Sequence, residues 1–495
     1  MGKEQMFMAL YSFSQSNVFL TGFVLGAVWI VSRLWTRCRS NKISSCKLPP
    51  GSNGWPFIGE NITFFKAINS TTNHPRQFSI DREKRYGPVF RSNLFGSAKT
   101  IVSVDAEFNK YVLQNEGRLF QAKYPSSNNN LVGKYGMVTV HGELQRKLHA
   151  TAVNLLKAEK MSSDFMDDIQ NALSTAMEKW ADMKDIHLQH ECHKIVLNLM
   201  AKKLLDLTPS QEMDGIYKAF KDFARALVCL PINIPGSTYY KGMKARNVII
   251  RTIHECIKER REHPEVERND LLTKLLKDGS LSDEIIADFL VFFLFAGFET
   301  SSTAMAFSIM FLTQNRQALQ ELTDEHFSLL KSKGNEKITW EDYMSMKFTH
   351  CVIKETLRLG NVAPLLPREA KQDIKIKDFV IPKGWSILVF LNATHLDEKY
   401  YHEALTFNPW RWQNEGHELS DKACFMPFGK GGRLCPGYHL ARLEIALFIH
   451  NFITKFRWEK LEDDHISYFP APTLVKGLPI HVYPNSLQYM DGKMG

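Results

Sequence analysis

Residues 428–437 read Phe-Gly-Lys-Gly-Gly-Arg-Leu-Cys-Pro-Gly, a glycine-rich loop built around one cysteine, Cys435. Pro436 suits the first position of a helix, and an amphipathic helix is predicted at 440–456. Glycines let a backbone approach a flat ligand closely, and loop amides with a helix N-terminus favour the thiolate form of a cysteine. The loop is therefore a candidate ligand site, although a lone cysteine in such a loop is more often a packed free thiol.

The complete pattern of the loop strengthens the ligand interpretation. Phe-x-x-Gly-x-Arg-x-Cys-x-Gly is met at every fixed position, by Phe428, Gly431, Arg433, Cys435 and Gly437. On this signature the protein resembles the cytochrome P-450 superfamily of haem-thiolate monooxygenases. The resemblance implies a mainly α fold with small β-sheets. It also implies haem b (iron protoporphyrin IX) as cofactor, with the Cys435 sulfur as the axial ligand of its iron.

Two more motifs of this superfamily follow in the expected order. Glu355-Thr-Leu-Arg358 matches Glu-x-x-Arg, and Phe-Asn-Pro-Trp-Arg-Trp at 407–412 matches the segment that carries Arg411. By resemblance Glu355, Arg358 and Arg411 form a buried ionic triad. The chemistry agrees, because Glu and Arg three residues apart share a helix face and a second arginine can satisfy the remaining carboxylate lone pairs. Taken alone, Glu-x-x-Arg is usually a solvated surface pair.

A long apolar helix is predicted to begin after Ser282. Asp283 and Glu284 occupy its first turn, where the helix dipole favours anions, and residues 287–312 show almost no polar face before Glu299. Such a helix is either central to a globular core or a second membrane span. The acidic residues in or beside it, and the absence of a close basic flank, favour a buried core helix.

Residues 296–300 of this helix, Ala-Gly-Phe-Glu-Thr, match the superfamily's Ala-Gly-x-Glu/Asp-Thr motif. Spacings of three and four place Ala296, Gly297 and Thr300 on one face, where two small residues leave room for dioxygen beside a hydroxyl. The resemblance gives Thr300 and Glu299 a role in delivering protons for O–O cleavage. The simpler alternative is that Gly297 permits helix packing and Glu299 forms a salt bridge.

Cations are expected at the haem propionates. By family position they are Arg433 and Arg368, while His149 stands where the family usually has an arginine. Histidine can donate a hydrogen bond, but its charge is weaker and depends on pH. Gln145 also departs from the family, which usually has Trp or His there. Lys430 replaces a customary glycine and adds charge on the face where an acidic reductase would dock.

Composition limits the other functions that the protein could have. The 495 residues are 44% hydrophobic, enough for a large core, and the net charge of +9 is spread along the sequence and does not form a basic arm. Nucleic acid is therefore not an expected partner. The eight cysteines form no CxxC pair and no Cys/His cluster, which argues against a disulfide framework or a zinc site.

The N-terminal region predicts one membrane anchor. Phe19–Val31 is uncharged and, extended back to Gln15, is about long enough to cross a bilayer. A cleaved signal peptide is the alternative, but no small-x-small site follows, whereas a basic cluster does. We expect a single-pass anchor in the endoplasmic reticulum membrane and a monomeric catalytic domain in the cytosol. The predicted boundaries are 1–35 for the anchor, 36–60 for a basic, proline-rich linker and 61–495 for the catalytic domain.

The periodicity predicts one large, mainly helical domain with small sheets from both ends of the sequence. Residues 141–360 read as helices, with long 3.6-residue patterns at 163–180 and 245–262. A β-hairpin is predicted from 89–94 and 100–104, and further strands only near 373–381 and 386–391.

Segments at 49–56, 120–127, 131–136 and 395–397 resemble the plant clan that acts on sterols and terpenoids, and most of all the brassinosteroid-type steroid C-22 hydroxylases. The resemblance implies an NADPH- and O2-dependent monooxygenase, with NADPH-cytochrome P-450 reductase as partner and a hydrophobic small molecule as substrate. The expected substrate is a sterol such as cholesterol or campesterol, with hydroxylation at the C-22 position of its aliphatic tail. A triterpenoid or diterpenoid hydroxylase is the alternative.

Two other classes are less favoured. A haem-thiolate isomerase or dehydratase acting without a reductase often lacks the acid and alcohol that Glu299 and Thr300 supply. A non-enzymatic haem-binding or scaffold protein would tolerate loss of the motifs that are present. By family position the substrate pocket draws on largely apolar segments at 122–133, 227–232, 292–300, 362–366 and 472–475.

Overall fold

The computed structural model describes residues 47–485 apart from 56–57, 69–74, 96, 98, 157–164, 209–210, 335, 377, 415–421 and 470. The predicted anchor at 1–35 lies outside these residues, as does part of the predicted linker.

Helices dominate the described residues, in agreement with the sequence pattern. Their bounds are α2 (Asn61–Ile68), α3 (Gln77–Tyr86), α4 (Ala106–Gln114), α5 (Ser126–Val132), α6 (Gly142–Leu155), α8 (Met166–Met183), α9 (Leu188–Leu205), α10 (Gln211–Ala226), α11 (Thr238–Glu262), α12 (Leu271–Asp278), α13 (Asp283–Gln314), α14 (Arg316–Lys333), α15 (Trp340–Ser345), α16 (Lys347–Gly360), α17 (Leu391–His395), α18 (Arg411–Asn414), α20 (Tyr438–Lys455) and the 3-10 turn η2 (Gly431–Arg433).

The strands are short. Their bounds are β1 (Gly51–Ser52), β2 (Val89–Ser92), β3 (Thr100–Ser103), β4 (Phe120–Ala122), β5 (Asp185–His187), β6 (Leu365–Ala370), β7 (Ile374–Ile376), β8 (Phe379–Ile381), β9 (Ser386–Phe390), β10 (Phe456–Lys460), β11 (Ile466–Ser467), β12 (Thr473–Leu474) and β13 (Pro479–Pro484).

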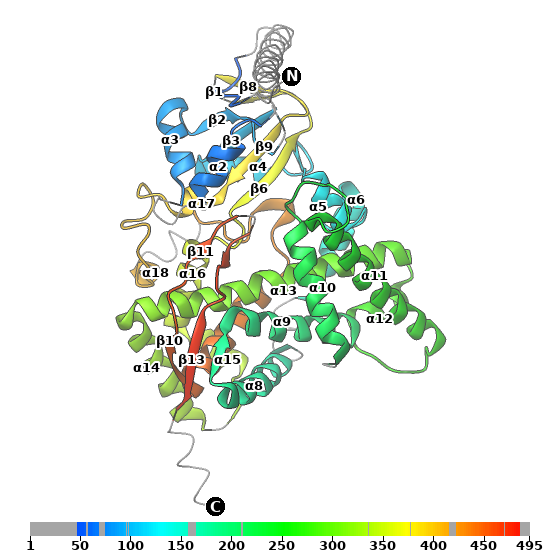
Figure 1. The fold of residues 1–495 in the computed structure, drawn as a ribbon, viewed down its shortest axis with the longest axis vertical. Coiled ribbons are helices and arrows are strands. Elements are labelled where there is room, and N and C mark those ends of the chain that lie inside the picture. The colour runs from blue at the N-terminus through cyan, green and yellow to red at the C-terminus, as the bar shows by residue number, and fades with distance from the viewer. Residues whose placement is uncertain are drawn as a thin grey trace, which may run out of the picture.

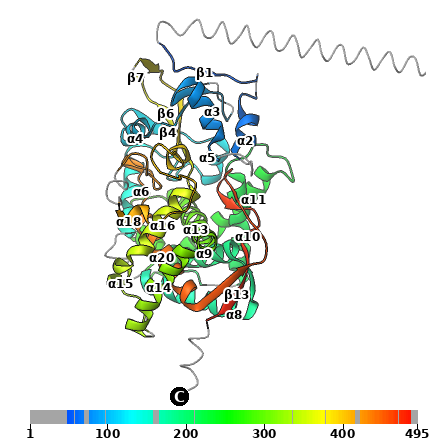
Figure 2. The same ribbon diagram turned by 90° about the vertical axis from the view of Figure 1, so that its left-hand side faces the viewer.

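The largest sheet joins segments from both ends of the sequence, as predicted. Its strand order is β1-β2-β3-β9-β6-β4, and β10, β13 and β5 form a smaller sheet. The six-stranded sheet lies at one end of the molecule and most of the helices lie at the other (Figures 1 and 2). β1 comes from the segment predicted as a linker, and it pairs in parallel with β2. The linker segment therefore contributes a strand to the folded domain.

The structure confirms the predicted hairpin and shows strands that the sequence pattern did not indicate. β2 and β3 pair antiparallel, with Val89 opposite Ser103. β6 was missed because it reads Leu-Leu-Pro-Arg-Glu-Ala, where proline and charged residues disfavour a strand assignment. β10 follows α20 directly and is stabilised by antiparallel pairing with the distant β13, so its partner is not visible in local sequence.

α13 is the central helix, as its composition predicts. The Ser282 hydroxyl accepts a hydrogen bond from the Ile285 amide and caps its first turn. Within the described residues α13 is the one helix long and apolar enough to cross a membrane, yet 61% of its most apolar window is buried inside the protein. It packs against α9, α11, α16 and α20 and crosses the middle of the helical part (Figure 1). Its hydrophobic length is therefore explained by the core.

A pair of buried histidines predicts acid sensitivity of the fold. His326 of α14 and His450 of α20 approach with their Nδ1 atoms 3.1 Å apart. Burial lowers the pKa of His450 to about 4 and that of His326 well below 6.5. Below pH 6.5 the unfolded protein therefore binds protons that the folded protein excludes, so these histidines make stability fall as the pH drops from 6.5 toward 4.

His450→Asn should reduce this pH dependence. We expect the free energy of unfolding to fall less between pH 7 and pH 5 in the variant than in the unsubstituted protein, by about 2 kcal/mol for one histidine. Urea denaturation at the two pH values measures this difference. If the free energy of unfolding depended on pH equally in His450→Asn and in the unsubstituted protein, the role of His450 in acid sensitivity would be contradicted. His254→Asn, at an exposed position of α11, is the control.

Candidate active site

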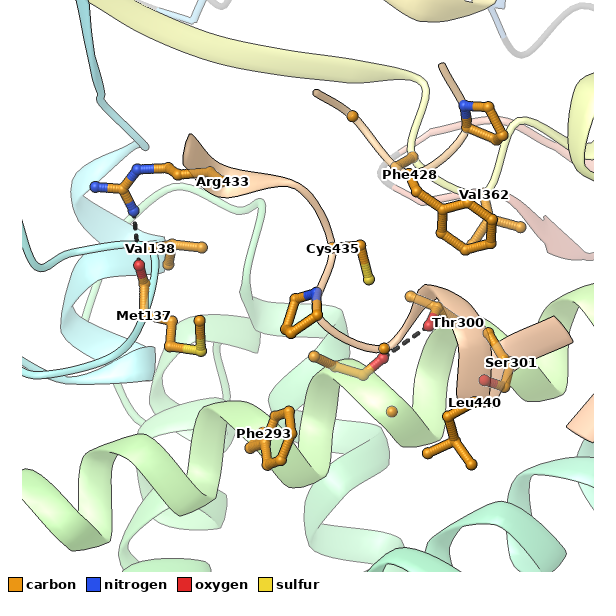
Figure 3. Close-up of a pocket in the computed structure, with 18 of the residues that line it drawn as sticks. Met137, Val138, Phe293, Thr300, Ser301, Val362, Phe428, Arg433, Cys435 and Leu440 are labelled. Atoms are coloured by element: carbon orange, nitrogen blue, oxygen red, sulfur yellow. Dashed lines mark hydrogen bonds between the residues drawn. The ribbon is translucent and has the colours of Figure 1, made fainter. Parts of the chain in front are cut away.

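One cavity lies between the cysteine loop (residues 428–437) and α13, with a volume of about 330 Å³. Cys435 and Phe428 line it on the loop side and Phe293 and Thr300 on the α13 side (Figure 3). Predicted pocket segments contribute Tyr124, Phe292, Ala296, Val362 and Leu366, whereas no residue of 227–232 or 472–475 lines it. The walls are mostly apolar, with a few polar groups gathered near the cysteine loop.

Tight backbone packing holds the cysteine loop in place. Gly431 has φ +73°, and a Cβ on it would lie 2.2 Å from the Leu113 carbonyl oxygen at the end of α4. Only glycine fits there, which explains this fixed position of the motif. The Cys435 amide donates to the Phe428 carbonyl at 3.0 Å and closes the loop. The Cys435 sulfur then points across the cavity toward α13 (Figure 3).

Cys435 can serve as a thiolate ligand only when a cation is bound beside it. Burial raises the pKa of its thiol to about 11, although a hydrogen bond with the Gly437 backbone partly opposes this shift. The sulfur alone would therefore stay protonated near neutral pH. A bound metal ion that pairs with the sulfur favours the thiolate.

The residues of the predicted helix motif, 296–300, lie on two different sides of α13. Ala296, Gly297 and Thr300 line the cavity, and the Thr300 hydroxyl donates to the Ala296 carbonyl at 2.8 Å (Figure 3). A Cβ on Gly297 would lie 2.8 Å from Cε of Met200. Gly297 thus also permits the close packing of α13 on α9. Glu299 does not line the cavity and faces His193, with Oε2 3.7 Å from Nε2.

The two predicted propionate arginines meet on one carboxylate. Glu116, which is 5% exposed, places one oxygen 2.7 Å from Nε of Arg433 and the other 2.7 Å from Nε of Arg368. Arg433 also donates to the carbonyls of Met137 and Val140. Both guanidinium groups line the cavity. Glu116 carries no motif in the sequence, and only the fold brings it between residues more than 250 positions away.

His149 and Gln145 of α6 hold the backbone of the cysteine loop. His149 Nε2 lies 2.7 Å from the Leu434 carbonyl oxygen, and the Gln145 amide donates to the Gly432 carbonyl at 3.3 Å. Both side chains line the cavity. The two departures from the family pattern therefore lie at the site, and both contact the cysteine loop directly.

Glu355, Arg358 and Arg411 come together as expected. Arg358 donates to both Glu355 oxygens at 2.8 and 2.9 Å, and Arg411 donates to one of them at 3.1 Å. The Trp412 indole and the Asn408 amide complete the set of donors to this carboxylate. Glu355 and Arg358 are fully buried.

A histidine that no motif indicated connects this triad to the cysteine loop. The His395 carbonyl accepts from Arg358 at 2.7 Å, and its ring Nε2 accepts from the Met426 amide at 3.1 Å, two residues before Phe428. Burial lowers the pKa of His395 to about 3, so the ring is neutral and can accept this bond. His395 thus joins the buried triad to the cysteine loop through one hydrogen bond at its carbonyl and one at its ring.

The residues around the cavity fit a haem. The Cys435 sulfur faces the cavity, Arg368 and Arg433 line it where carboxylates could bind, and the remaining walls are mostly small and apolar side chains. Cys435 would bind the iron, while Arg368 and Arg433 would bind the propionates. A dedicated group of His, Cys, Asp and Glu for a separate metal ion is absent among the described residues.

Glu116→Ala should weaken haem retention. Without this carboxylate the two buried arginines repel each other and lose the contact that orients them, which costs on the order of 3 kcal/mol. We expect less haem per protein after gel filtration, at unchanged helical content. Glu369→Ala removes a more exposed carboxylate that pairs with Lys123 on the same sheet, and should retain haem normally. Full retention in Glu116→Ala would refute this role.

Comparison with known proteins agrees with this site. The cytochrome P450 family model matches residues 49–483. Cytochrome P450 720B2 of Pinus taeda is 61% identical over 442 residues, 88% of this chain and 91% of that protein. The abietadienol/abietadienal oxidase of Pinus taeda is 56% identical over 457 residues, 92% and 94% of the two proteins. The structure of retinoic acid-bound cyanobacterial CYP120A1 has a TM-score of 0.78 at 25% identity, and the match covers 89% of this protein and 100% of that one.

These relatives show that the predicted sterol substrate is wrong. The steroid (22S)-hydroxylase of Oryza sativa subsp. indica is 40% identical over 447 residues, 88% of each protein. That resemblance is real, but it is weaker than the 56% identity to the abietadienol/abietadienal oxidase. The terpenoid alternative therefore agrees better with the comparisons. With the family model covering most of the sequence and the site geometry in place, the protein belongs to the cytochrome P450 family and is a monooxygenase with a haem-iron cofactor.

Proposed function

We propose that this enzyme oxidises a diterpenoid alcohol or aldehyde. The observation that carries the proposal is the 56% identity, over nearly the whole length, to an abietadienol/abietadienal oxidase. The cavity supports it, because its mostly apolar walls suit the hydrocarbon skeleton of a diterpenoid.

The site residues divide into those that hold the cofactor and those that handle protons. Haem, when bound, supplies the activation of dioxygen with electrons that come from NADPH through a separate reductase. Cys435 would hold the iron, and Arg368 and Arg433 would hold the propionates. Thr300 holds a proton at its hydroxyl beside the substrate, Glu299 supplies that proton from behind α13, and the small side chain of Ala296 leaves space next to the hydroxyl.

The proposal includes a cellular setting, which rests on the predicted anchor and on one exposed apolar loop. A membrane anchor at 1–35 would place the catalytic domain on the cytosolic face of the endoplasmic reticulum, next to a membrane-bound reductase. The loop between α10 and α11 supports membrane contact, because Leu230, Ile232 and Ile234 are 75%, 48% and 61% exposed. A monomer with this surface turned to the lipid could take up an apolar substrate directly from the bilayer.

A substrate panel tests the proposal. Microsomes that contain the enzyme and a reductase would receive NADPH with abietadienol, abietadienal, a triterpenoid alcohol, cholesterol or campesterol, and mass spectrometry would identify the products. We expect oxidation of the diterpenoids, with aldehyde formed from the alcohol and acid from the aldehyde. Turnover of a sterol or triterpenoid in preference to both diterpenoids would overturn it.

Thr300→Ala should separate electron consumption from product formation. The variant keeps the fold and the haem, because the hydroxyl bonds only within its own helix, but it loses the group that holds a proton at the cavity wall. We expect NADPH consumption to continue while product falls on the order of 10-fold or more and hydrogen peroxide rises. Thr300→Ser retains a hydroxyl and should stay coupled. Unchanged coupling in Thr300→Ala would remove the proton-holding role.

A further inference from the structure

Glu299 does not line the cavity and faces α9, where it lies beside His193. α9 and α13 run antiparallel there, with Gln189 bonded to Thr303 at 3.1 Å, His193 beside Glu299 and Met200 against Gly297. The missing side chain of Gly297 permits this close approach. Gly297, two residues before Glu299 on α13, therefore allows His193 of α9 to lie next to Glu299.

His193 is held in place but has an unused polar atom. Its ring lies against Phe298, with centroids 4.9 Å apart, and its side chain is 14% exposed. Its Nε2 is buried and makes no hydrogen bond within the described residues. At 3.7 Å from Oε2 of Glu299, a small side-chain rotation would close the gap to hydrogen-bond distance.

The pair is arranged so that the proton sits on the acid near neutral pH. Burial raises the pKa of Glu299 to about 7, and burial, with smaller effects from His190 and Lys221, lowers the pKa of His193 to about 3. A protonated carboxyl therefore faces a neutral imidazole. An imidazole can accept a proton at one nitrogen while it releases one from the other, so it can restore the carboxyl after the carboxyl has given its proton away.

A second polar pair lies one turn away from His193 on α9. The Tyr217 hydroxyl of α10 lies 2.7 Å from Nδ1 of His190, one turn before His193 on α9. The Tyr217 ring also lies 6.1 Å from that of Phe298. The titratable and charged groups around this contact are His187 just before α9, His190, Glu191, His193 and Lys194 on α9, Tyr217, Lys221 and Arg225 on α10, and Glu299 on α13.

We infer that His193 is a positioning residue that reprotonates Glu299, with solvent as the source of the proton. In each cycle the Glu299 carboxyl gives one proton toward Thr300 and becomes a carboxylate. The carboxylate then takes the proton from Nε2 of His193, and Nδ1 of His193 takes one from solvent, to which the side chain is 14% exposed, so one proton moves inward for each proton that Glu299 gives away. This inference deepens the proposed function, since it rests on Glu299 supplying protons to the cavity.

Two substitutions separate the relay from a merely structural role. His193→Gln keeps a hydrogen-bond donor beside Glu299 but cannot pass a proton through its amide. We expect normal folding and haem content, product formation lowered roughly tenfold, more peroxide per NADPH, and a larger solvent deuterium isotope effect on product formation. His254→Gln, an exposed histidine on α11, should change none of these.

Infrared titration gives a readout that does not depend on turnover. The difference between the unsubstituted enzyme and Glu299→Gln identifies the C=O band of the Glu299 carboxyl, and its midpoint is expected near pH 7. His193→Phe removes the donor, so the band should persist to higher pH by about one unit. His193→Gln should leave the midpoint close to that of the unsubstituted enzyme.

The outcomes distinguish the two proposals. An unchanged isotope effect in His193→Gln, or an unchanged midpoint in His193→Phe, would overturn the relay even if the diterpenoids are oxidised. If no diterpenoid is oxidised, the infrared titration still tests the contact between His193 and Glu299, and any substrate that the panel identifies serves for the isotope effect.

Discussion

Cys435→Ala is expected to abolish oxidation completely. The reduced protein with carbon monoxide should lose the strongly red-shifted Soret band that reports thiolate ligation, because the loop offers the iron no other sulfur. The fold should survive, since the Cys435 side chain faces the cavity and its backbone bond to Phe428 does not need the sulfur. Product formation should fall to the uncatalysed background, which makes this the largest effect that we predict.

Two other cysteines serve as controls for this result. Cys424 and Cys351 are buried outside the cavity, and burial raises the pKa of each thiol. Replacing either one by alanine should leave the Soret band and the product yield unchanged. A thiolate spectrum that persists in Cys435→Ala, or disappears in Cys424→Ala, would assign the ligand elsewhere.

Glu355→Ala is expected to destabilise the protein by about 3–5 kcal/mol, because it leaves the buried Arg358 without its carboxylate partner. The Trp412 indole and the Asn408 amide lose their acceptor as well. Since His395 connects Arg358 to the cysteine loop, we also expect haem to be released at a lower urea concentration. Circular dichroism and the Soret absorbance, followed in the same urea titration, measure both effects.

An exposed ion pair provides the matched comparison for this prediction. Arg261 and Asp283 pair at 2.6 Å with 60% and 32% of their side chains exposed. Arg261→Ala should cost less than about 1 kcal/mol and leave haem retention unchanged. If Arg261→Ala and Glu355→Ala lowered the free energy of unfolding by similar amounts, burial would not explain the stabilising effect of the triad.

The sequence predicted those parts of the site that are encoded locally. The cysteine loop, the Glu-x-x-Arg pair and the Ala-Gly-x-Glu-Thr segment each lie within ten residues, so their spacing alone identifies them. The central helix was predictable for the same reason, because an uninterrupted apolar stretch with acidic residues at its start requires burial. The short hairpin of β2 and β3 is also local.

Features that depend on distant residues could not be predicted in this way. Glu116 meets Arg368 and Arg433, and His193 meets Glu299, only after the protein has folded. β6 and β10 form strands because of their partners, against their own local preference or without a local signal. The substrate class was predicted wrongly because it rested on the resemblance of short segments to steroid C-22 hydroxylases, and the apolar pocket segments do not distinguish a sterol from a diterpenoid.

The parallel pairing of β3 with β9 has a consequence for folding during synthesis on the ribosome. Thr100 pairs with Ser386, so after Thr100 the ribosome must add 286 residues before β9, the second partner of β3, begins to appear. At about 5–20 residues per second this takes roughly 15–60 s. During that time the hairpin of β2 and β3 presents an open edge, which is a template for pairing with other polypeptides. Expression yield should therefore depend on chaperones that cover this edge until β9 emerges.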